Sequence, residues 1–231
     1  MGNDDAVAFG SADPGSNVWG EVIVCFITHI PFVWTSAVLF RRGFPFECVS
    51  ALFTTIFSFM YHYCEIADTA IILRPLQWHR LDNITAISSF MNICYHLTLF
   101  EKAETRNYIY FLSFFVVMIL QEGYPWDERY TAGPVLFAVP FPIISLLLYP
   151  QKRAFLNLRR VAIGVFVTLL SALFFIRGLD DKTDPLRIFH GMFHLLVGVG
   201  VYIMWSGIKY QRAQKTDDAT RISSTSVIFR A

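Results

Sequence analysis

The sequence predicts an all-α, polytopic membrane protein with a bundle of seven transmembrane helices. Of the 231 residues, 55% are hydrophobic and 16% are charged, against about 25% charged residues in a typical soluble domain. The mean hydropathy is +0.46, so a soluble fold of this length would lack the charge to cover its surface. The net charge of +1 also argues against nucleic-acid binding, which needs a basic patch.

Seven apolar stretches approach the length of about 20 residues that a bilayer span needs. They cover residues 18–40, 46–67, 81–100, 108–121, 133–149, 161–176 and 186–208. The fourth and sixth are short, and the fifth carries Pro134, Pro140 and Pro142, which predict a kink because proline cannot donate a backbone hydrogen bond. We therefore expect a short polar N-terminal segment (1–17), one transmembrane domain (18–208), and a flexible, basic, Ser/Thr-rich tail (209–231).

Basic residues between the spans predict the orientation, because cytoplasmic loops are enriched in Lys and Arg. With the N-terminus outside, 13 of the 19 basic residues fall on the inner side and 6 on the outer side. We expect an outer or lumenal N-terminus and a cytoplasmic C-terminus, in the plasma membrane or a membrane of the secretory pathway.

Five polar residues from three different spans fall at one depth in this topology. Ser58 and His62 lie in the outer half of the second span, Asp82 opens the third, and His190 and His194 lie in the first two turns of the seventh. Residues four apart share one face of a helix. Polar groups within a membrane segment are costly and mark functional sites.

Three histidines with one open position are a common ligand set of catalytic zinc. His62, His190 and His194 are therefore the predicted ligands of Zn²⁺, which lowers the pKa of bound water to about 7. Asp82 is expected to accept a proton from that water or to hold the water in line for its attack. Ser58 is expected to hydrogen-bond the water or a developing oxyanion.

The other polar residues have simpler interpretations. His29 and His96 have no partner four residues away and are expected to be hydrogen-bonded core residues, whereas His79 is expected in an outer loop. The acids expected to be solvated outer-loop charges, with one or two of them as candidates for the mouth of the site, are Glu65, Asp68, Asp180, Asp181 and Asp184. The cysteines (Cys25, Cys48, Cys64 and Cys94) are expected to be small buried residues, since they form no CxxC pair.

The sequon Asn83-Ile84-Thr85 lies at the membrane edge of a predicted span, where glycosylation is not expected.

Ser58-x-x-x-His62, Asp82 and His190-x-x-x-His194 in seven spans resemble the CREST superfamily, which includes alkaline ceramidases, PAQR receptors and myomaker-like proteins. Met60-Tyr61-His62-Tyr63-Cys64-Glu65 and Gly133-Pro134 are most similar to the myomaker and GPI-processing phospholipase A2 branch. The resemblance implies a zinc-dependent lipid hydrolase, with zinc on the three histidines and with Ser58 and Asp82 supporting the water.

The chain departs from that branch in three places. Its N-terminal segment is short, Ile71-Ile72-Leu73 stands where a second cysteine is expected after Cys64, and the tail lacks the cysteine-rich end of myomaker. A loop disulfide through Cys64 and a role in cell fusion therefore have no support in the sequence.

The leading hypothesis is a hydrolase that cleaves an acyl ester or amide in a membrane lipid, such as a phospholipid, a GPI acyl chain or a ceramide. The alternative is a non-catalytic receptor or structural, membrane-remodelling protein that keeps the metal site. A channel or transporter is the weakest hypothesis, because the polar residues are confined to one leaflet. The sequence leaves the oligomeric state and the physiological lipid open.

Overall fold

The computed structural model describes residues 17–125, 127–179 and 184–209. In these ranges the chain is helical, and extended pairing is limited to two isolated bridges, Ile71 with Leu73 and Leu156 with Ile208. The elements are α1 (Val18–Thr28), α2 (Ile30–Arg41), α3 (Pro45–Ile66), α4 (Pro75–Leu97), α5 (Ala103–Gly123), α6 (Glu128–Ala138), α7 (Pro140–Leu148), η2 (Pro150–Phe155), α8 (Leu158–Arg177), η4 (Pro185–Arg187) and α9 (Ile188–Ser206). The predicted all-α class is confirmed. The predicted terminal segments lie outside the described residues, apart from Asn17 and Lys209.

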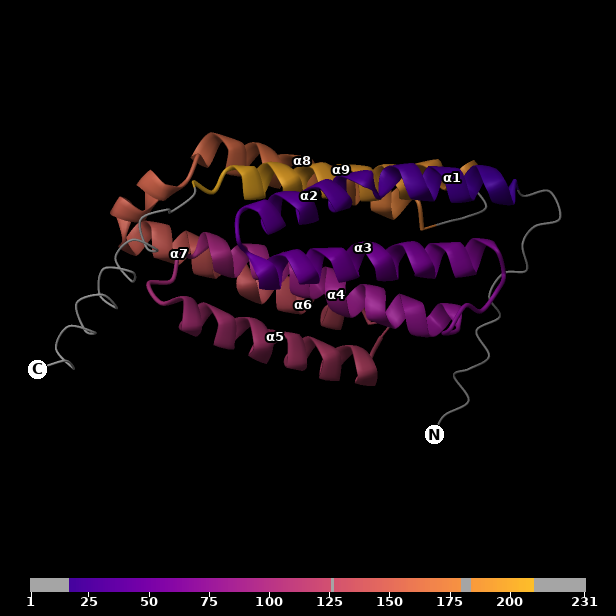
Figure 1. The fold of residues 1–231 in the computed structure, drawn as a ribbon, viewed down its shortest axis with the longest axis horizontal. Coiled ribbons are helices and arrows are strands. Elements are labelled where there is room, and N and C mark those ends of the chain that lie inside the picture. The colour runs from indigo at the N-terminus through magenta and orange to yellow at the C-terminus, as the bar shows by residue number, and fades with distance from the viewer. Residues whose placement is uncertain (1–16, 126, 180–183, 210–231) are drawn as a thin grey trace, which may run out of the picture.

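The helices lie side by side in an elongated bundle (Figure 1), with α1 continued by α2 and α6 continued by α7. We call each continued pair, and each single helix, a rod. Among the described residues, four rods are long and apolar enough to cross a membrane: Val18–Arg41, Glu128–Leu148, Leu158–Arg177 and Ile188–Ser206. These four rods are compatible with a multi-pass membrane protein.

Large apolar side chains cover the outward faces of the bundle. Phe26 is 61% exposed, Phe137 is 65% exposed and Leu169 is 66% exposed, and many neighbours on the same helices are similarly open. Contiguous apolar surface of this extent marks a membrane or protein contact, because soluble monomers rarely expose it. The outward faces therefore agree with a lipid environment.

Several helices extend beyond the apolar stretches that predicted them. α4 begins at Pro75, six residues before the predicted start, so Asp82 lies in the third turn of the helix and not at its opening. α5 begins at Ala103, five residues before the predicted start. Hydropathy detects only the apolar part of a helix, whereas polar residues continue the hydrogen-bonded turns at its ends.

Two of the rods contain a break. The predicted kink in the fifth stretch is confirmed, since α6 ends at Ala138 and α7 begins at Pro140. A second break, between α1 and α2 at His29, was not predicted. Pro31 in the first turn of α2 has no N–H to offer the Ile27 carbonyl, and the His29 N–H bonds the Phe26 carbonyl at 3.3 Å.

α9 lies at the centre of one side of the bundle and packs against α8, α2 and α1. Its most extensive contact is with α8, where Gly200 faces Gly164. A Cβ built on Gly200 would lie 2.8 Å from the Gly164 carbonyl oxygen and would also meet the Thr168 side chain. The two backbones therefore pack at a distance that only glycine permits, as is common between membrane helices.

Gly200→Ala is expected to destabilise the protein by about 1–3 kcal/mol, because the added methyl group overpacks a backbone contact. The thermal midpoint of unfolding in detergent micelles measures the effect. Gly133→Ala in α6 is the matched control, since a Cβ there meets nothing within 4 Å. Equal stability of the two variants would show that α8 and α9 do not need this close approach.

Candidate metal centre

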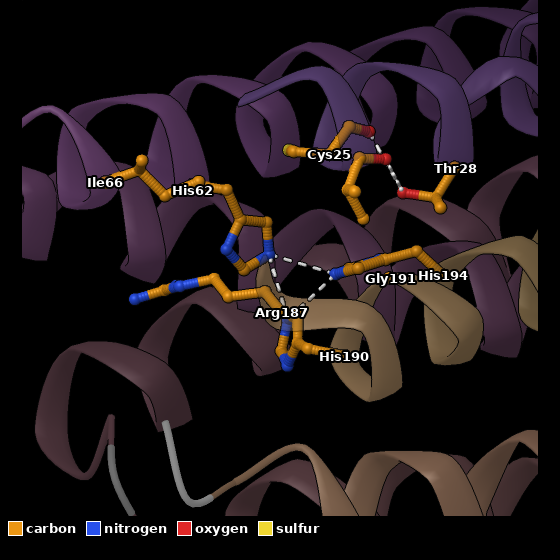
Figure 2. Close-up of a pocket in the computed structure, with 9 residues that line it drawn as sticks. Cys25, Thr28, His62, Ile66, Arg187, His190, Gly191 and His194 are labelled. Carbon is orange, nitrogen blue, oxygen red and sulfur yellow. Dashed lines mark hydrogen bonds between the residues drawn. The ribbon is translucent and has the colours of Figure 1, made fainter. Parts of the chain in front are cut away.

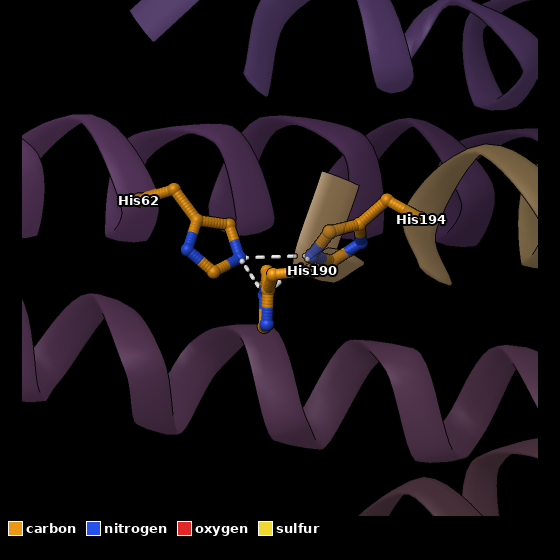
Figure 3. Close-up of side chains that lie close together, drawn as sticks. All are labelled: His62, His190 and His194. Atoms are coloured by element: carbon orange, nitrogen blue, oxygen red, sulfur yellow. Dashed lines mark hydrogen bonds between the residues drawn. The ribbon is translucent and has the colours of Figure 1, made fainter. Parts of the chain in front are cut away.

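Three imidazole rings from two helices meet at one point (Figure 3). His62 projects from the last turns of α3, whereas His190 and His194 project from the first two turns of α9. The Nε2 atom of His62 lies 2.9 Å from that of His194 and 3.2 Å from that of His190, and the last two are 3.1 Å apart. His62 and His194 are buried, and His190 is partly buried.

Hydrogen bonds among themselves do not satisfy these three nitrogens. Each neutral imidazole carries one N–H, and its other nitrogen offers only a lone pair. A cation that accepts all three lone pairs removes the repulsion. The nitrogens of a tetrahedral zinc site, at about 2.0–2.1 Å from the ion, lie about 3.3–3.4 Å apart. The observed triangle needs to widen by only a few tenths of an ångström, so the three residues form a group that can hold a metal ion.

A second layer of charged residues supports His62. The Glu65 carboxylate lies 3.7 Å from His62 Nδ1, which has no hydrogen-bond partner among the described residues. The same carboxylate accepts a hydrogen bond of 2.8 Å from the Tyr61 hydroxyl and pairs with the Arg187 guanidinium. The prediction that Glu65 is a solvated loop charge is therefore wrong. Its position three residues after His62 on one helix face was the available signal.

Asp184 fixes the start of α9. It is 2% exposed, and its carboxylate accepts the backbone N–H of Phe189 at 2.8 Å and that of His190 at 2.9 Å. The prediction of a solvated loop charge is wrong here as well, because unpaired N–H groups at a helix start attract a carboxylate. An aspartate followed by proline ahead of an apolar run was the sequence signal.

The remaining acids divide into two groups. Asp68 is exposed, in agreement with the prediction. Asp180 and Asp181 lie outside the described residues.

The structure places Ser58 beside Asp82. Ser58 is 4% exposed, one helical turn before His62, and its hydroxyl lies within interaction range of the half-buried Asp82 carboxyl of α4. Its Oγ also lies 3.1 Å from Nε2 of His29. Two of the five predicted residues therefore meet across α3 and α4, but neither belongs to the three-histidine group or lines the pocket beside it.

Of the other histidines near the site, His29 agrees with the prediction and His79 departs from it. His29 is buried and hydrogen-bonded as predicted, but it is not isolated, since its ring centroid lies 4.5 Å from that of His194. His79 belongs to the second turn of α4 and not to a loop, and its ring stacks on Tyr61 at 4.2 Å.

His96 is a hydrogen-bonded core residue, as predicted. Its Nδ1 lies 3.0 Å from Glu47 Oε1, which also accepts the Tyr110 hydroxyl at 3.0 Å. This buried group lies near the first turn of α3, at the opposite end of the helix from His62.

A pocket reaches the three histidines from the side of α1 (Figure 2). Cys25 and Thr28 of α1 line it opposite the imidazoles, and Ile66 and Arg187 lie beside the rings. Val24 of α1 also lines the pocket. α1 and α2 pack against both α3 and α9, so they bridge the two helices that carry the rings. The pocket leaves a cavity about the size of one water molecule beside the nitrogen triangle.

The four cysteines are free; Cys25 and Cys64 are buried, whereas Cys48 and Cys94 are half-buried. The side chain of Asn83 donates to the Pro125 carbonyl at 3.4 Å and is half-buried. This position agrees with the expectation that the sequon is not glycosylated.

A family model described as "Protein of unknown function (DUF3522)" matches residues 17–195. The matched region extends from the start of α1 into α9 and contains all five predicted site residues. No curated protein matches the chain.

If the three histidines hold a metal ion, Glu65→Gln is expected to weaken its binding by about 10–100-fold, because a carboxylate beside the outer nitrogen of a metal-bound histidine orients the ring and raises its basicity. Competition with a chelator of known affinity measures the change. Asp68→Asn, which alters an exposed acid just beyond the end of α3, is the control. An unchanged affinity in Glu65→Gln would show that Glu65 interacts with Tyr61 and Arg187 without supporting His62.

Proposed function

We propose that this chain, which belongs to the DUF3522 family of proteins of unknown function, is a zinc-dependent membrane hydrolase that cleaves an acyl ester or amide bond in a lipid. The observation that carries the proposal is the triangle of Nε2 atoms of His62, His190 and His194, 2.9–3.2 Å apart at the end of a pocket. Imidazole ligands suit Zn²⁺ among several transition metals, and three of them with an open position are typical of catalytic zinc.

The proposal includes seven membrane crossings, with the N-terminus outside or in the lumen. Four rods have the apolar composition of a span. α3, α4 and α5 are 22, 23 and 21 residues long, which suffices for a hydrocarbon core of about 30 Å. The excess of basic residues at the opposite end of the bundle supports an outer position of the histidines.

The residues around the triangle supply the groups that hydrolysis needs. A zinc ion bound there supplies an acidic water and a Lewis acid for the carbonyl. Asp82 is the base that takes a proton from the attacking water and returns it to the leaving group. Ser58 orients that water, and the apolar wall formed by Val24 and Ile66 receives the acyl chain. The depth of these residues, close to the headgroups, matches the position of acyl bonds in a bilayer.

The resemblance of the five polar residues to the CREST superfamily supports an acyl lipid as substrate, either a phospholipid, a GPI lipid or a ceramide. One observation favours the alternative, a non-catalytic receptor or structural protein that keeps the metal. The cavity volume at the histidines is about 10 Å³, room for about one water molecule, whereas ligand pockets usually hold about 300–1,000 Å³. Under this alternative, zinc is present but no lipid is turned over.

His190→Ala is expected to remove bound zinc, because two imidazoles alone do not complete the site. Elemental analysis of the purified protein for zinc, copper, iron and nickel measures the loss and identifies the metal. His96→Ala, which removes a buried histidine of α4 near the first turn of α3, is expected to keep the metal. Equal metal content in the wild type and His190→Ala would contradict the proposed centre.

Asp82→Asn is expected to keep zinc and to lower hydrolysis by at least about 100-fold, because the amide cannot accept the proton. The assay measures fatty acid released from phosphatidylcholine and from ceramide in mixed micelles, with Asp68→Asn as control. If Asp82→Asn turns over like the wild type, Asp82 is not the base. If the zinc-loaded wild type turns over neither lipid, the receptor alternative is favoured.

A further inference from the structure

His29 occupies the break between α1 and α2, where it is 3% exposed. In a continuous helix, its backbone N–H would bond the Cys25 carbonyl four residues earlier. At this break the N–H bonds the Phe26 carbonyl, and the imidazole Nδ1 lies 2.7 Å from the Cys25 carbonyl oxygen. The side chain therefore replaces the missing backbone donor.

That contact fixes which ring nitrogen of His29 carries the proton. A carbonyl oxygen only accepts hydrogen bonds, so Nδ1 is the donor. The neutral ring then has a bare lone pair at Nε2. Ser58 Oγ is 3.1 Å from this atom and also faces the Asp82 carboxyl. If the hydroxyl donated its single proton to Asp82, two lone pairs would face each other at 3.1 Å, so we assign the proton to His29 Nε2.

We propose that His29 is a positioning residue that holds the Ser58 proton away from the reaction and leaves the Ser58 oxygen as an acceptor. This inference rests on the proposed function. With its proton engaged, Ser58 receives a hydrogen bond from the attacking water, or from Asp82 after Asp82 has taken the proton. The sequence left two roles open for Ser58, a hydrogen bond with the water and a hydrogen bond to a developing oxyanion. The inference keeps the first role and excludes the second, because Ser58 has no free proton to donate to an oxyanion.

Two neighbouring rings pack against the His29 imidazole. The His29 ring packs at 4.5 Å from the ring of His194 and at 5.9 Å from that of Phe32. Ser58 lies one turn before His62 on α3. His29, at the break between α1 and α2, therefore orients the Ser58 hydroxyl on the helix that also carries the proposed ligand His62.

Two substitutions separate the two hydrogen bonds of His29. In His29→Gln, the amide oxygen reaches the place of Nε2 and still accepts the Ser58 proton. In His29→Asn, the shorter amide reaches only the Cys25 carbonyl. We expect His29→Asn to lower kcat for the phosphatidylcholine or ceramide probe by about 10–100-fold, with KM and zinc content unchanged, and His29→Gln to recover most of that loss.

His96→Asn is the control for the loss of a buried imidazole, since His96 is 4% exposed and bonds Glu47 far from the site. It is expected to lower the thermal midpoint without changing kcat per folded molecule. Equal kcat in His29→Asn and His29→Gln, whether reduced or not, would overturn the positioning role.

A second measurement decides the hydrogen bond without any turnover. In full-length protein with ¹⁵N-labelled histidine, nuclear magnetic resonance reports which nitrogen of His29 is protonated, with His29→Gln identifying its signals. We expect a protonated Nδ1 and a bare Nε2 whose resonance shifts in Ser58→Ala. A protonated Nε2, or no response to Ser58→Ala, overturns the inference. If the wild type binds zinc but hydrolyses nothing, the hydrolase proposal fails, while this spectrum still decides the contact between His29 and Ser58.

Discussion

The meeting of three imidazole nitrogens within 2.9–3.2 Å of one another is the constraint on which the polar end of the bundle depends. Lone pairs at this distance repel unless a cation or a shared proton lies among them. α3 brings one ring and α9 brings two, and α1 and α2 pack against both helices. The packing of α1 and α2 therefore sets the distance between α3 and α9, and with it the size of the nitrogen triangle.

The chain holds His190 in place through a strained turn. Leu186 and Arg187 have φ angles of +59° and +52°, and each left-handed residue costs about 1–2 kcal/mol. Asp184 offsets part of this cost by accepting two backbone N–H groups at the start of α9. Arg187, just before α9, pairs with Glu65 and Glu21. The same turn therefore ties α9 to α3 and to α1 next to the histidines.

Much of this arrangement could be predicted from the sequence, because it depends on local periodicity. Apolar runs gave the helices, and Pro140 gave the break between α6 and α7. The spacing of His190 and His194 placed both rings on one face of a helix. The predicted topology then placed His62, Ser58 and Asp82 at the same depth as these two histidines. The starts of α4 and α5 were missed because polar residues continue a helix beyond its apolar part.

His29 and His96 show why the rest could not be predicted. In the sequence both are single histidines in apolar runs, with no partner four residues away. Their roles separate only in three dimensions, since His96 meets Glu47 and Tyr110, whereas His29 meets Ser58 and packs on His194. The turn of the His29 ring onto the Cys25 carbonyl follows from the break ahead of Pro31. The helical periodicity of the sequence cannot predict this contact, because the contact arises at the residue where the helix is interrupted. The hydrogen bond that the break creates joins residues 29 positions apart, and it brings α1 into a site that the sequence assigned to α3, α4 and α9.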